Sequence, residues 1–237
     1  MSNPAAFLGI VGQAFDFIVN GREAVGGGVH VGGPHQILEL GAKQLEVTLL
    51  ALAVSILIAM PVGLLLGHYG KGEFLAVSAG NAGRAIPELA LIALMAAAIG
   101  VGLTNLTVAL AILGIPPILT NTFVGIKQVD RSAVDAAKGM GMNALQIITR
   151  VEMPMAVPTI MGGVRTSSIN IIATATIAPL VGILTLGDFI ISRNVYSDAG
   201  VLAGAVLVAL MALTLELVLA GVQWALTSPG LKLKSSN

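Results

Sequence analysis

Hydrophobic residues gather along this chain in long, almost uninterrupted stretches, which short polar turns separate. A stretch of about 20 apolar residues is long enough to cross a bilayer as a helix. Five stretches fit this description, and we predict membrane-spanning helices at residues 47–66, 74–101, 106–126, 156–180 and 201–226. The predicted fold class is therefore an all-α membrane protein with five transmembrane helices.

Prolines interrupt two of these stretches. Pro87 breaks the second stretch, and Pro116 and Pro117 break the third. A proline removes a backbone hydrogen bond from a helix, and lipid offers the freed carbonyl group no partner. We expect these breaks to face a water-filled pathway along the second, third and fourth spans, with packing against neighbouring helices as the alternative.

Four ionisable residues fall within the predicted spans, where charge is costly and usually functional. Glu88 follows Arg84 by four residues, so the two can pair on one helix face. Arg165 is expected to extend to the inner membrane surface. Glu216 is expected to pair with a neighbouring helix or to line a dimer interface.

The N-terminal region has a different pattern. Residues 7–19 are apolar but too short to span, and they include Gln13 and Asp16. This pattern predicts a short amphipathic helix on the membrane surface, with an irregular first transmembrane helix as the alternative. Residues 20–34 are rich in glycine and predict a flexible loop.

The longest polar segment inside the membrane domain covers residues 128–154. Ser132 and Asp135 have the spacing of a capping pair, which predicts the start of a helix. Gly141 suits the left-handed end of that helix. We expect the exposed side of this helix to present the small residues Ala136 and Ala137.

A second short helix is predicted directly after the first. Asn143 is a suitable N-cap for a helix over residues 144–151. Pro154 is expected to end it, because the residue before a proline is disfavoured in the helical region. The segment therefore predicts two short helices that meet at a glycine.

Basic residues predict the orientation, because Lys and Arg are more frequent in cytoplasmic loops. Nine of the twelve lie on the side of residues 128–154: Lys71, Arg84, Lys127, Arg131, Lys138, Arg150, Arg165, Lys232 and Lys234. The opposite side has Arg22, Lys43 and Arg193. The chain then divides into an N-terminal extracytoplasmic segment (1–44), a transmembrane domain (45–228) and a cytoplasmic tail (229–237).

The composition removes several functional classes. Only 10% of the 237 residues are charged and 56% are hydrophobic, and the formal net charge of +0 gives no indication of nucleic-acid binding. The absence of cysteine excludes thiol catalysis and thiolate metal sites. His30, His35 and His68 all lie outside the spans, and the sequence has no H-E-x-x-H, so an intramembrane enzyme is disfavoured.

The polar segment also resembles a known family. Asp135-Ala136-Ala137, then Gly141, then Met153-Pro154 is similar to the EAA loop of binding-protein-dependent ABC importers. In that family Glu-Ala-Ala-x-x-x-Gly, followed by a Leu-Pro-like pair, forms coupling helices that dock on ATPase subunits. Asp135 replaces the usual Glu. The resemblance implies that this loop couples the chain to an ATPase through Asp135, Ala136, Ala137, Gly141 and Pro154.

Other segments, spread over residues 45–226, resemble the permeases for osmoprotectants such as glycine betaine, choline, carnitine and proline betaine. They include Arg84 with Ile86-Pro87 and Leu89-Ala90-Leu91, Pro116-Pro117 with Asn121-Thr122, Gly162-Gly163-Val164-Arg165-Thr166, and Ala173-Thr174-Ala175-Thr176. Glu88 stands where that family usually has a small polar residue.

The resemblance implies a type I ABC importer permease core in the plasma or inner membrane, with the N-terminus outside and the C-terminus in the cytoplasm. The implied partners are two ATPase subunits, a second identical or homologous permease and an extracytoplasmic substrate-binding protein. No cofactor is expected in this chain, since it has no G-x-x-x-x-G-K-[ST] segment and the ATPase would bind ATP and Mg. The residues expected along the pathway are Arg84, Pro87, Glu88, Pro116, Pro117, Asn121, Thr122, Ser168, Asn170 and Thr174.

Two other transport functions are kept as alternatives. An ABC permease for another small polar solute, such as an amino acid, would have the same coupling loop. A secondary transporter would instead predict an internal repeat and carboxylates at the middle of the membrane. The sequence has no convincing repeat.

Overall fold

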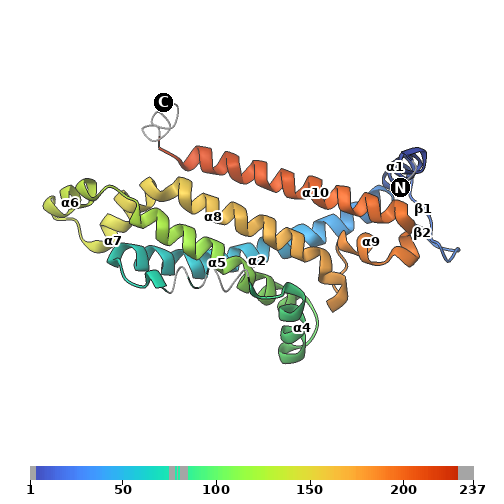
Figure 1. Ribbon diagram of the computed structural model, residues 1–237, viewed down its shortest axis with the longest axis horizontal. Coiled ribbons are helices and arrows are strands. Elements are labelled where there is room, and N and C mark those ends of the chain that lie inside the picture. The colour runs from blue at the N-terminus through green and yellow to red at the C-terminus, as the bar shows by residue number, and fades with distance from the viewer. Residues whose placement is uncertain (1–3, 75–77, 79, 81–84, 229–237) are drawn as a thin grey trace. The chain divides into compact units, whose positions relative to one another are not determined.

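The computed structural model describes residues 4–74, 78, 80 and 85–228, and these residues are mostly helical (Figure 1). They form two compact units, each assembled from three separate segments of the chain. Unit 1 comprises Met1–Leu50, Glu88–Leu110 and Ile172–Leu213. Unit 2 comprises Ala51–Pro87, Ala111–Ile171 and Thr214–Asn237.

Unit 1 begins with helix α1 (Pro4–Val19) and a small hairpin. Strands β1 (Arg22–Glu23) and β2 (His30–Val31) pair antiparallel, with Arg22 opposite Val31. Residues 22–31 therefore form a short hairpin within the segment that the glycine content had predicted to be a flexible loop. The unit also holds the first part of α2 (Gly33–Tyr69), α4 (Glu88–Ile99), the start of α5 (Leu103–Lys127), the 3-10 helix η2 (Ala175–Val181), α9 (Gly187–Ile191) and the start of α10 (Arg193–Leu226).

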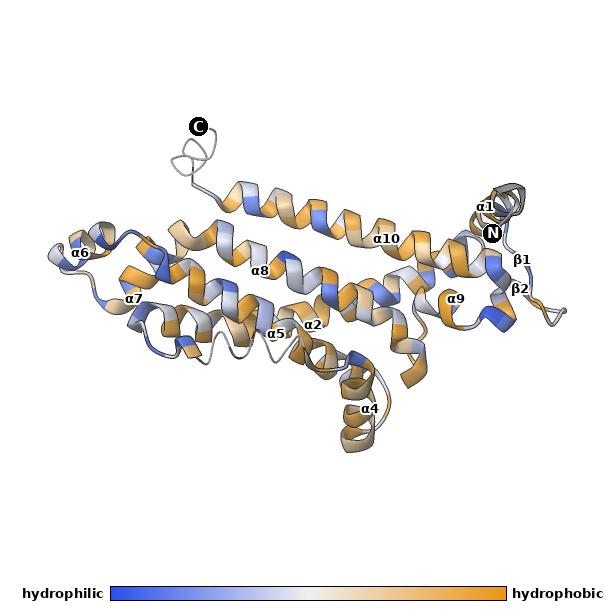
Figure 2. Cartoon of the chain, in the orientation of Figure 1, coloured by the Kyte–Doolittle hydropathy of each residue, from blue (hydrophilic) through white to orange (hydrophobic). Residues whose placement is uncertain are grey.

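Unit 2 holds the remaining parts of α2, α5 and α10, together with the elements of the polar segment. These elements are α6 (Arg131–Gly139), α7 (Ala144–Ile147), the π-helix η1 (Ile148–Glu152) and most of α8 (Met153–Thr174). Figure 2 shows hydrophilic residues concentrated in α6, whereas α2, α4 and α10 are mainly hydrophobic.

Four helical segments are long and apolar enough to cross a membrane: Gly33–Tyr69, Leu103–Lys127, Ala144–Val181 and Arg193–Leu226. They contain the first, third, fourth and fifth predicted spans. The second predicted span is described only in part, because residues 75–77, 79 and 81–84 lie outside the described residues. Its second half is α4, a helix of 12 residues.

The prediction of proline breaks was right at one position and wrong at the other. Ile86 and Pro87 are not helical, and α4 begins directly after them at Glu88. Pro116 and Pro117, in contrast, lie inside α5, which continues through both of them. The third span is thus a single helix from Leu103 to Lys127.

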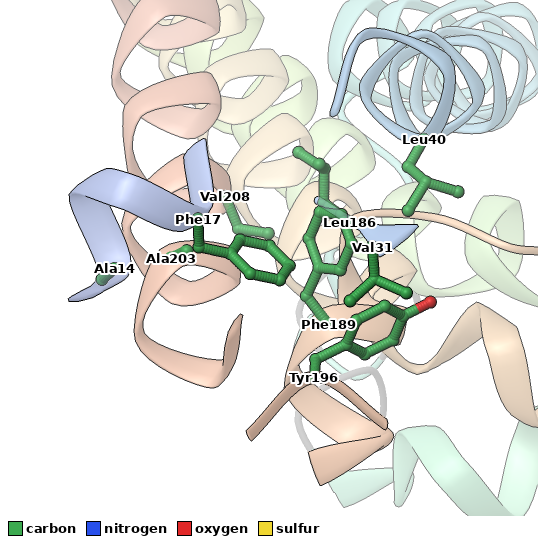
Figure 3. Close-up of a cluster of buried hydrophobic side chains, with 9 residues drawn as sticks. All are labelled: Ala14, Phe17, Val31, Leu40, Leu186, Phe189, Tyr196, Ala203 and Val208. Atoms are coloured by element: carbon green, nitrogen blue, oxygen red, sulfur yellow. The ribbon is translucent and has the colours of Figure 1, made fainter. Parts of the chain in front are cut away.

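Three aromatic rings form the centre of unit 1 (Figure 3). The ring of Phe17 from α1 meets that of Phe189 from α9 edge-to-face, with centroids 5.1 Å apart. The ring of Tyr196 packs on Phe189 in the same way at 4.9 Å. The residues that surround these rings in the buried cluster are Ala14, Val31, Leu40, Leu186, Ala203 and Val208.

Residues 188–198, between the fourth and fifth predicted spans, are mostly helical, and a hydrogen-bonded carboxylate organises them. Asp188 accepts hydrogen bonds from the hydroxyl groups of Ser192 (2.8 Å) and Tyr196 (2.6 Å). Ser197 has a left-handed φ of 61°, which bends α10 near its start. The aromatic ring of Tyr196 therefore lies in the apolar cluster, while its hydroxyl group is bound to Asp188.

Unit 2 is held together by close approaches of helices at small residues. A Cβ atom on Gly163 of α8 would lie 2.7 Å from both the Pro117 carbonyl oxygen and the Asn121 Cβ of α5. A Cβ on Gly63 of α2 would lie 2.7 Å from the Cβ of Thr122 on α5. Glycine at these positions lets the backbones approach, as is common where helices pack in a membrane.

Two serines bind α5 from its neighbours near the proline pair. Ser55 of α2 donates to the Ala111 carbonyl at 2.9 Å, and Ser167 of α8 donates to the Gly114 carbonyl at 2.9 Å. Between these two carbonyls lie those of residues 112 and 113. In a regular helix they would accept hydrogen bonds from the N–H groups of residues 116 and 117, which the two prolines lack. The proline pair therefore lies in a packed helix contact, which favours the packing alternative over an open pathway at this position.

Candidate coupling loop and pathway residues

The polar segment forms two capped helical turns joined by a glycine. Asp130 caps α6, with its carboxylate accepting a hydrogen bond from the Ser132 N–H at 2.9 Å. The predicted cap at Ser132 was therefore two residues late. The prediction of a helix in this segment was correct.

The end of α6 agrees with the prediction for Gly141, whose φ is 78°. The Gly141 N–H donates to the Lys138 carbonyl at 2.9 Å, and the Met142 N–H donates to the Ala137 carbonyl at 3.1 Å. These two bonds form a Schellman motif. The motif needs a residue in the left-handed conformation, which glycine adopts without strain because it has no Cβ atom. The turn between the two helices is thus fixed by backbone hydrogen bonds.

The second helix starts where the sequence predicted it. Asn143 and Gln146 form a reciprocal capping box at the start of α7, with bonds of 2.9 and 3.0 Å. Pro154 does not end this helix, contrary to the prediction, because α7, the π-helix η1 and α8 follow one another without interruption. Pro154 is the second residue of α8, directly after the π turn, where the regular hydrogen-bond pattern of an α-helix is already altered.

The burial of the loop corrects one expectation. Ala137 was expected on the exposed side, but only 1% of it is exposed, because it packs with Val134 and Ile147 in a cluster inside unit 2. Asp135 and Ala136 are exposed, as expected. The small size of Ala137 therefore serves the packing of the loop on its own membrane helices.

Two apolar side chains of the loop were missed by the sequence reasoning. Met140 and Leu145 are both 70% exposed, and they flank Gly141 within the most polar segment of the described membrane domain. A large apolar residue on each side of a glycine turn could have indicated an exposed contact site. Both residues lie outside the predicted spans, so contact with lipid does not explain their exposure.

A buried histidine–glutamate pair anchors the loop to the membrane helices. Nδ1 of His68, near the end of α2, lies 2.7 Å from Oε2 of Glu152 in the π-helix η1. Their side chains are 10% and 2% exposed. His68 had been placed outside the spans, and Glu152 in the polar segment, so sequence reasoning had no signal that joined them.

The charges predicted in the fourth and fifth spans meet each other. Arg165 Nε donates to Glu216 Oε1 at 2.8 Å, and Arg165 Nη1 donates to Gln223 Oε1 at 2.9 Å. The partner of Glu216 is therefore Arg165 on α8 of the same chain, in agreement with the expected pairing of Glu216 with a neighbouring helix. This network joins α8 to the final part of α10 within unit 2.

The pathway residues predicted in unit 2 are mostly packed inside it. Thr122 and Ser168 are fully buried, and Asn121 donates to the Pro117 carbonyl at 2.8 Å. Asn170 is exposed, and Arg84 lies outside the described residues. Within unit 2 the predicted residues thus include both packing residues and one exposed polar residue.

Two pathway residues predicted in unit 1 are brought together. The Thr174 hydroxyl donates to Glu88 Oε2 at 2.6 Å, which joins the first residue of α4 to the last residue of α8. Thr174 is buried and Glu88 is exposed. No group of three or more metal-ligating side chains occurs among the described residues.

Comparison with known proteins identifies the family. The family model described as "Binding-protein-dependent transport system inner membrane component" matches residues 52–229, which is more than half of the chain and includes the whole α6–α8 region. The chain belongs to this family. It is therefore a transport subunit of the membrane, and α1 with the β hairpin lies outside the matched region.

Curated relatives from bacteria are similar over most of their length. The chain is 36% identical over 198 residues to the glycine betaine/carnitine/choline transport system permease protein OpuCB of Bacillus subtilis (strain 168), covering 83% of this chain and 91% of that protein. It is 35% identical over 191 residues to the choline transport system permease protein OpuBB of the same organism, covering 80% and 88%.

A solved structure of a methionine importer has the same fold. The match is to a chain in "Inward facing conformations of the MetNI methionine ABC transporter", with a TM-score of 0.69 and 21% identity. It covers 81% of this chain and 97% of that chain. The predicted fold of an ABC importer permease is confirmed by this likeness together with the family match.

Proposed function

We propose that this chain is the permease subunit through which an ATP-driven importer moves a small osmoprotectant such as glycine betaine, choline, carnitine or proline betaine. The observation that carries the proposal is the coupling loop, residues 130–154, with its fixed glycine turn and exposed apolar pair. The names of the relatives, which mention glycine betaine, carnitine and choline, support the substrate class.

The ATPase docks on the coupling loop in this proposal. Met140 and Leu145 enter a groove of the ATPase, while Asp135, Ala136 and Gly141 form the polar and small surface beside them. The Schellman turn and the capping box support this role, because they fix the loop before docking and so reduce the entropy lost on binding. Ala137 and Pro154 act from inside the chain, by holding the loop against the membrane helices. ATP and Mg bind to the ATPase subunits.

The complete importer contains further chains. Two ATPase subunits, a second permease and an extracytoplasmic binding protein complete it. Both OpuCB and OpuCD of Bacillus subtilis are similar to this chain, at 36% and 32% identity, and their names assign both to one transport system. The second permease is therefore either a copy of this chain or a homologue.

The proposed orientation places the N-terminus outside and the C-terminus in the cytoplasm. It follows from the distribution of basic residues along the sequence. The natural absence of cysteine allows a direct test by single-cysteine labelling. Lys138→Cys should react only after the membrane is permeabilised, and Arg193→Cys should react from outside in intact cells. External labelling at position 138 would reverse the orientation.

In unit 1 the proposed pathway uses Glu88, which directly follows the helix break at Pro87, and the hydroxyl group of Thr174. In unit 2 it uses Asn170, which is exposed. Five further residues support the pathway by packing the helices of unit 2: Pro116, Thr122 and Ser168, which are buried, and Pro117 and Asn121, which are half-buried. Exposed polar groups within apolar helices are otherwise costly in lipid.

The decisive experiment reconstitutes the permease with its ATPase and binding protein in proteoliposomes. We expect uptake of labelled choline or glycine betaine that needs ATP and all components. Uptake driven by an ion gradient without the ATPase would make the chain a secondary transporter. ATP-dependent uptake of amino acids, without uptake of quaternary ammonium solutes, would show that the substrates are amino acids and not osmoprotectants.

A further inference from the structure

Arg84, the predicted partner of Glu88, lies outside the described residues. Glu88 itself is a charge in an apolar part of unit 1. It begins α4, whose other eleven residues are Leu, Ala, Ile or Met. The 3-10 helix η2, which contacts α4, has no charged residue either. An ionised carboxylate in such surroundings is costly unless a positive charge or several hydrogen bonds compensate it.

The described part of the chain supplies little compensation. The Thr174 hydroxyl donates one hydrogen bond to Oε2 at 2.6 Å. Among the described residues, the ion pairs join other side chains, and none of them includes Glu88. The carboxylate is also exposed rather than packed away, so a cation from outside the chain can approach it.

The backbone is irregular next to both residues of this hydrogen bond, Glu88 and Thr174. The helix of the second predicted span is broken at Ile86 and Pro87, directly before Glu88. Thr174 is the last residue of α8, after which the chain continues as a 3-10 helix. In secondary transporters, substrates and ions commonly bind where discontinuous helices meet, and we use this as an analogy for the position of Glu88.

We propose that Glu88 is a charge filter in the substrate pathway, which favours solutes with a net positive charge over zwitterions. The inference rests on the proposed function and specifies the substrate. Choline carries a quaternary ammonium group and a neutral hydroxyl group, so the Glu88 carboxylate attracts it. Glycine betaine and carnitine carry the same cation together with a carboxylate, which Glu88 repels. Thr174 is a positioning residue that orients the Glu88 carboxylate.

The test measures initial uptake rates of choline and glycine betaine, each with saturating loaded binding protein, so that the affinity of the binding protein does not enter. We expect Glu88→Gln to lower the ratio of choline rate to glycine betaine rate about tenfold, as expected for loss of a charge interaction of moderate strength. Glu88→Asp should retain most of the ratio. Thr174→Val should shift the ratio in the same direction as Glu88→Gln, but less.

Glu39→Gln is the matched control. Glu39 is an exposed carboxylate on α2 in unit 1, where it lines a cleft of about 460 Å³ with Lys43, Glu46 and Leu184. We expect its neutralisation to leave the ratio unchanged. An unchanged ratio in Glu88→Gln, or an equal shift in Glu39→Gln, would overturn the assignment to Glu88. Transport of neither solute by the wild-type complex would instead refute the proposed function, and the charge filter with it.

Discussion

The two units of this protein are held together in different ways. Unit 1 is organised by large aromatic side chains, in which Phe17, Phe189 and Tyr196 contact one another edge-to-face. Unit 2 has no comparable ring cluster among its described residues, and its helices approach at glycine, serine and threonine.

The difference follows from what drives burial in each case. Aromatic rings contribute a large apolar area and a preferred geometry, which suits a cluster beside polar groups such as the Asp188 carboxylate and a β hairpin. In a bilayer, lipid is as apolar as a leucine side chain, so helices associate through close packing and hydrogen bonds between them. Close glycine contacts also occur in unit 1, where a Cβ on Gly204 would lie 2.8 Å from the Phe189 Cβ. The comparison therefore predicts that loss of aromatic volume destabilises unit 1 specifically, while added volume at the helix contacts destabilises unit 2.

The largest expected effect is at Phe17. Phe17→Ala leaves a cavity in the aromatic cluster and should cost about 3–5 kcal/mol of unfolding free energy. Phe15→Ala is the control, because Phe15 is 69% exposed on the same helix and Phe17 is fully buried. Hydrogen exchange should show the loss of protection in residues 187–213 and leave residues 111–171 unchanged. Equal loss in both segments would contradict the separate packing of the units.

The next effect is at Gly163. Gly163→Val places side-chain atoms against the Pro117 backbone and should cost about 1–3 kcal/mol by overpacking. Gly162→Val is a matched control on the same helix, since nothing lies within 4 Å of a Cβ at that position. The unfolding of both variants in detergent, followed by SDS titration, gives the comparison. Equal stability of the two variants would remove the evidence for close packing of α5 and α8.

The smallest effect is at the serine hydrogen bonds. Ser167→Ala removes the hydrogen bond to the Gly114 carbonyl and should cost about 0.6 kcal/mol, the usual size of such bonds in membranes. Thr166→Ala is the control, because the Thr166 hydroxyl bonds only within its own helix turn, to Gly162. The same SDS titration measures both. A larger loss of unfolding free energy in Thr166→Ala than in Ser167→Ala would contradict the claim that Ser167 stabilises the protein through its bond to a neighbouring helix.

Much of the fold was predictable because it depends on local patterns. The long apolar stretches located four spanning helices, and Pro87 located a real break. The turn between α6 and α7 was predictable because Gly141 and Asn143 act through neighbouring backbone groups, which are visible in the sequence. The proline pair misled the prediction, because α2 and α8 support α5 through Ser55 and Ser167.

The remaining features depend on partners far apart in the chain. His68 meets Glu152 across 84 residues, and Arg165 meets Glu216 across 51. Neither pairing has a periodicity or a spacing that a single sequence can reveal. Ala137 was correctly predicted to lie in the first short helix, but it was expected to be exposed and is buried. Its burial depends on how the loop packs on Ile126 and Ile160, which the local sequence does not show.

The central claim is that the ATPase docks on the coupling loop and drives transport through this contact. The double variant Met140→Asp/Leu145→Asp tests it directly. Both side chains are exposed, so the variant should insert and fold normally, yet it should lose the co-purifying ATPase and the ATPase activity stimulated by loaded binding protein. Val25→Asp makes the same change at an exposed apolar residue of the hairpin and should retain both. A double variant that keeps a wild-type amount of bound ATPase and full stimulation would contradict the account.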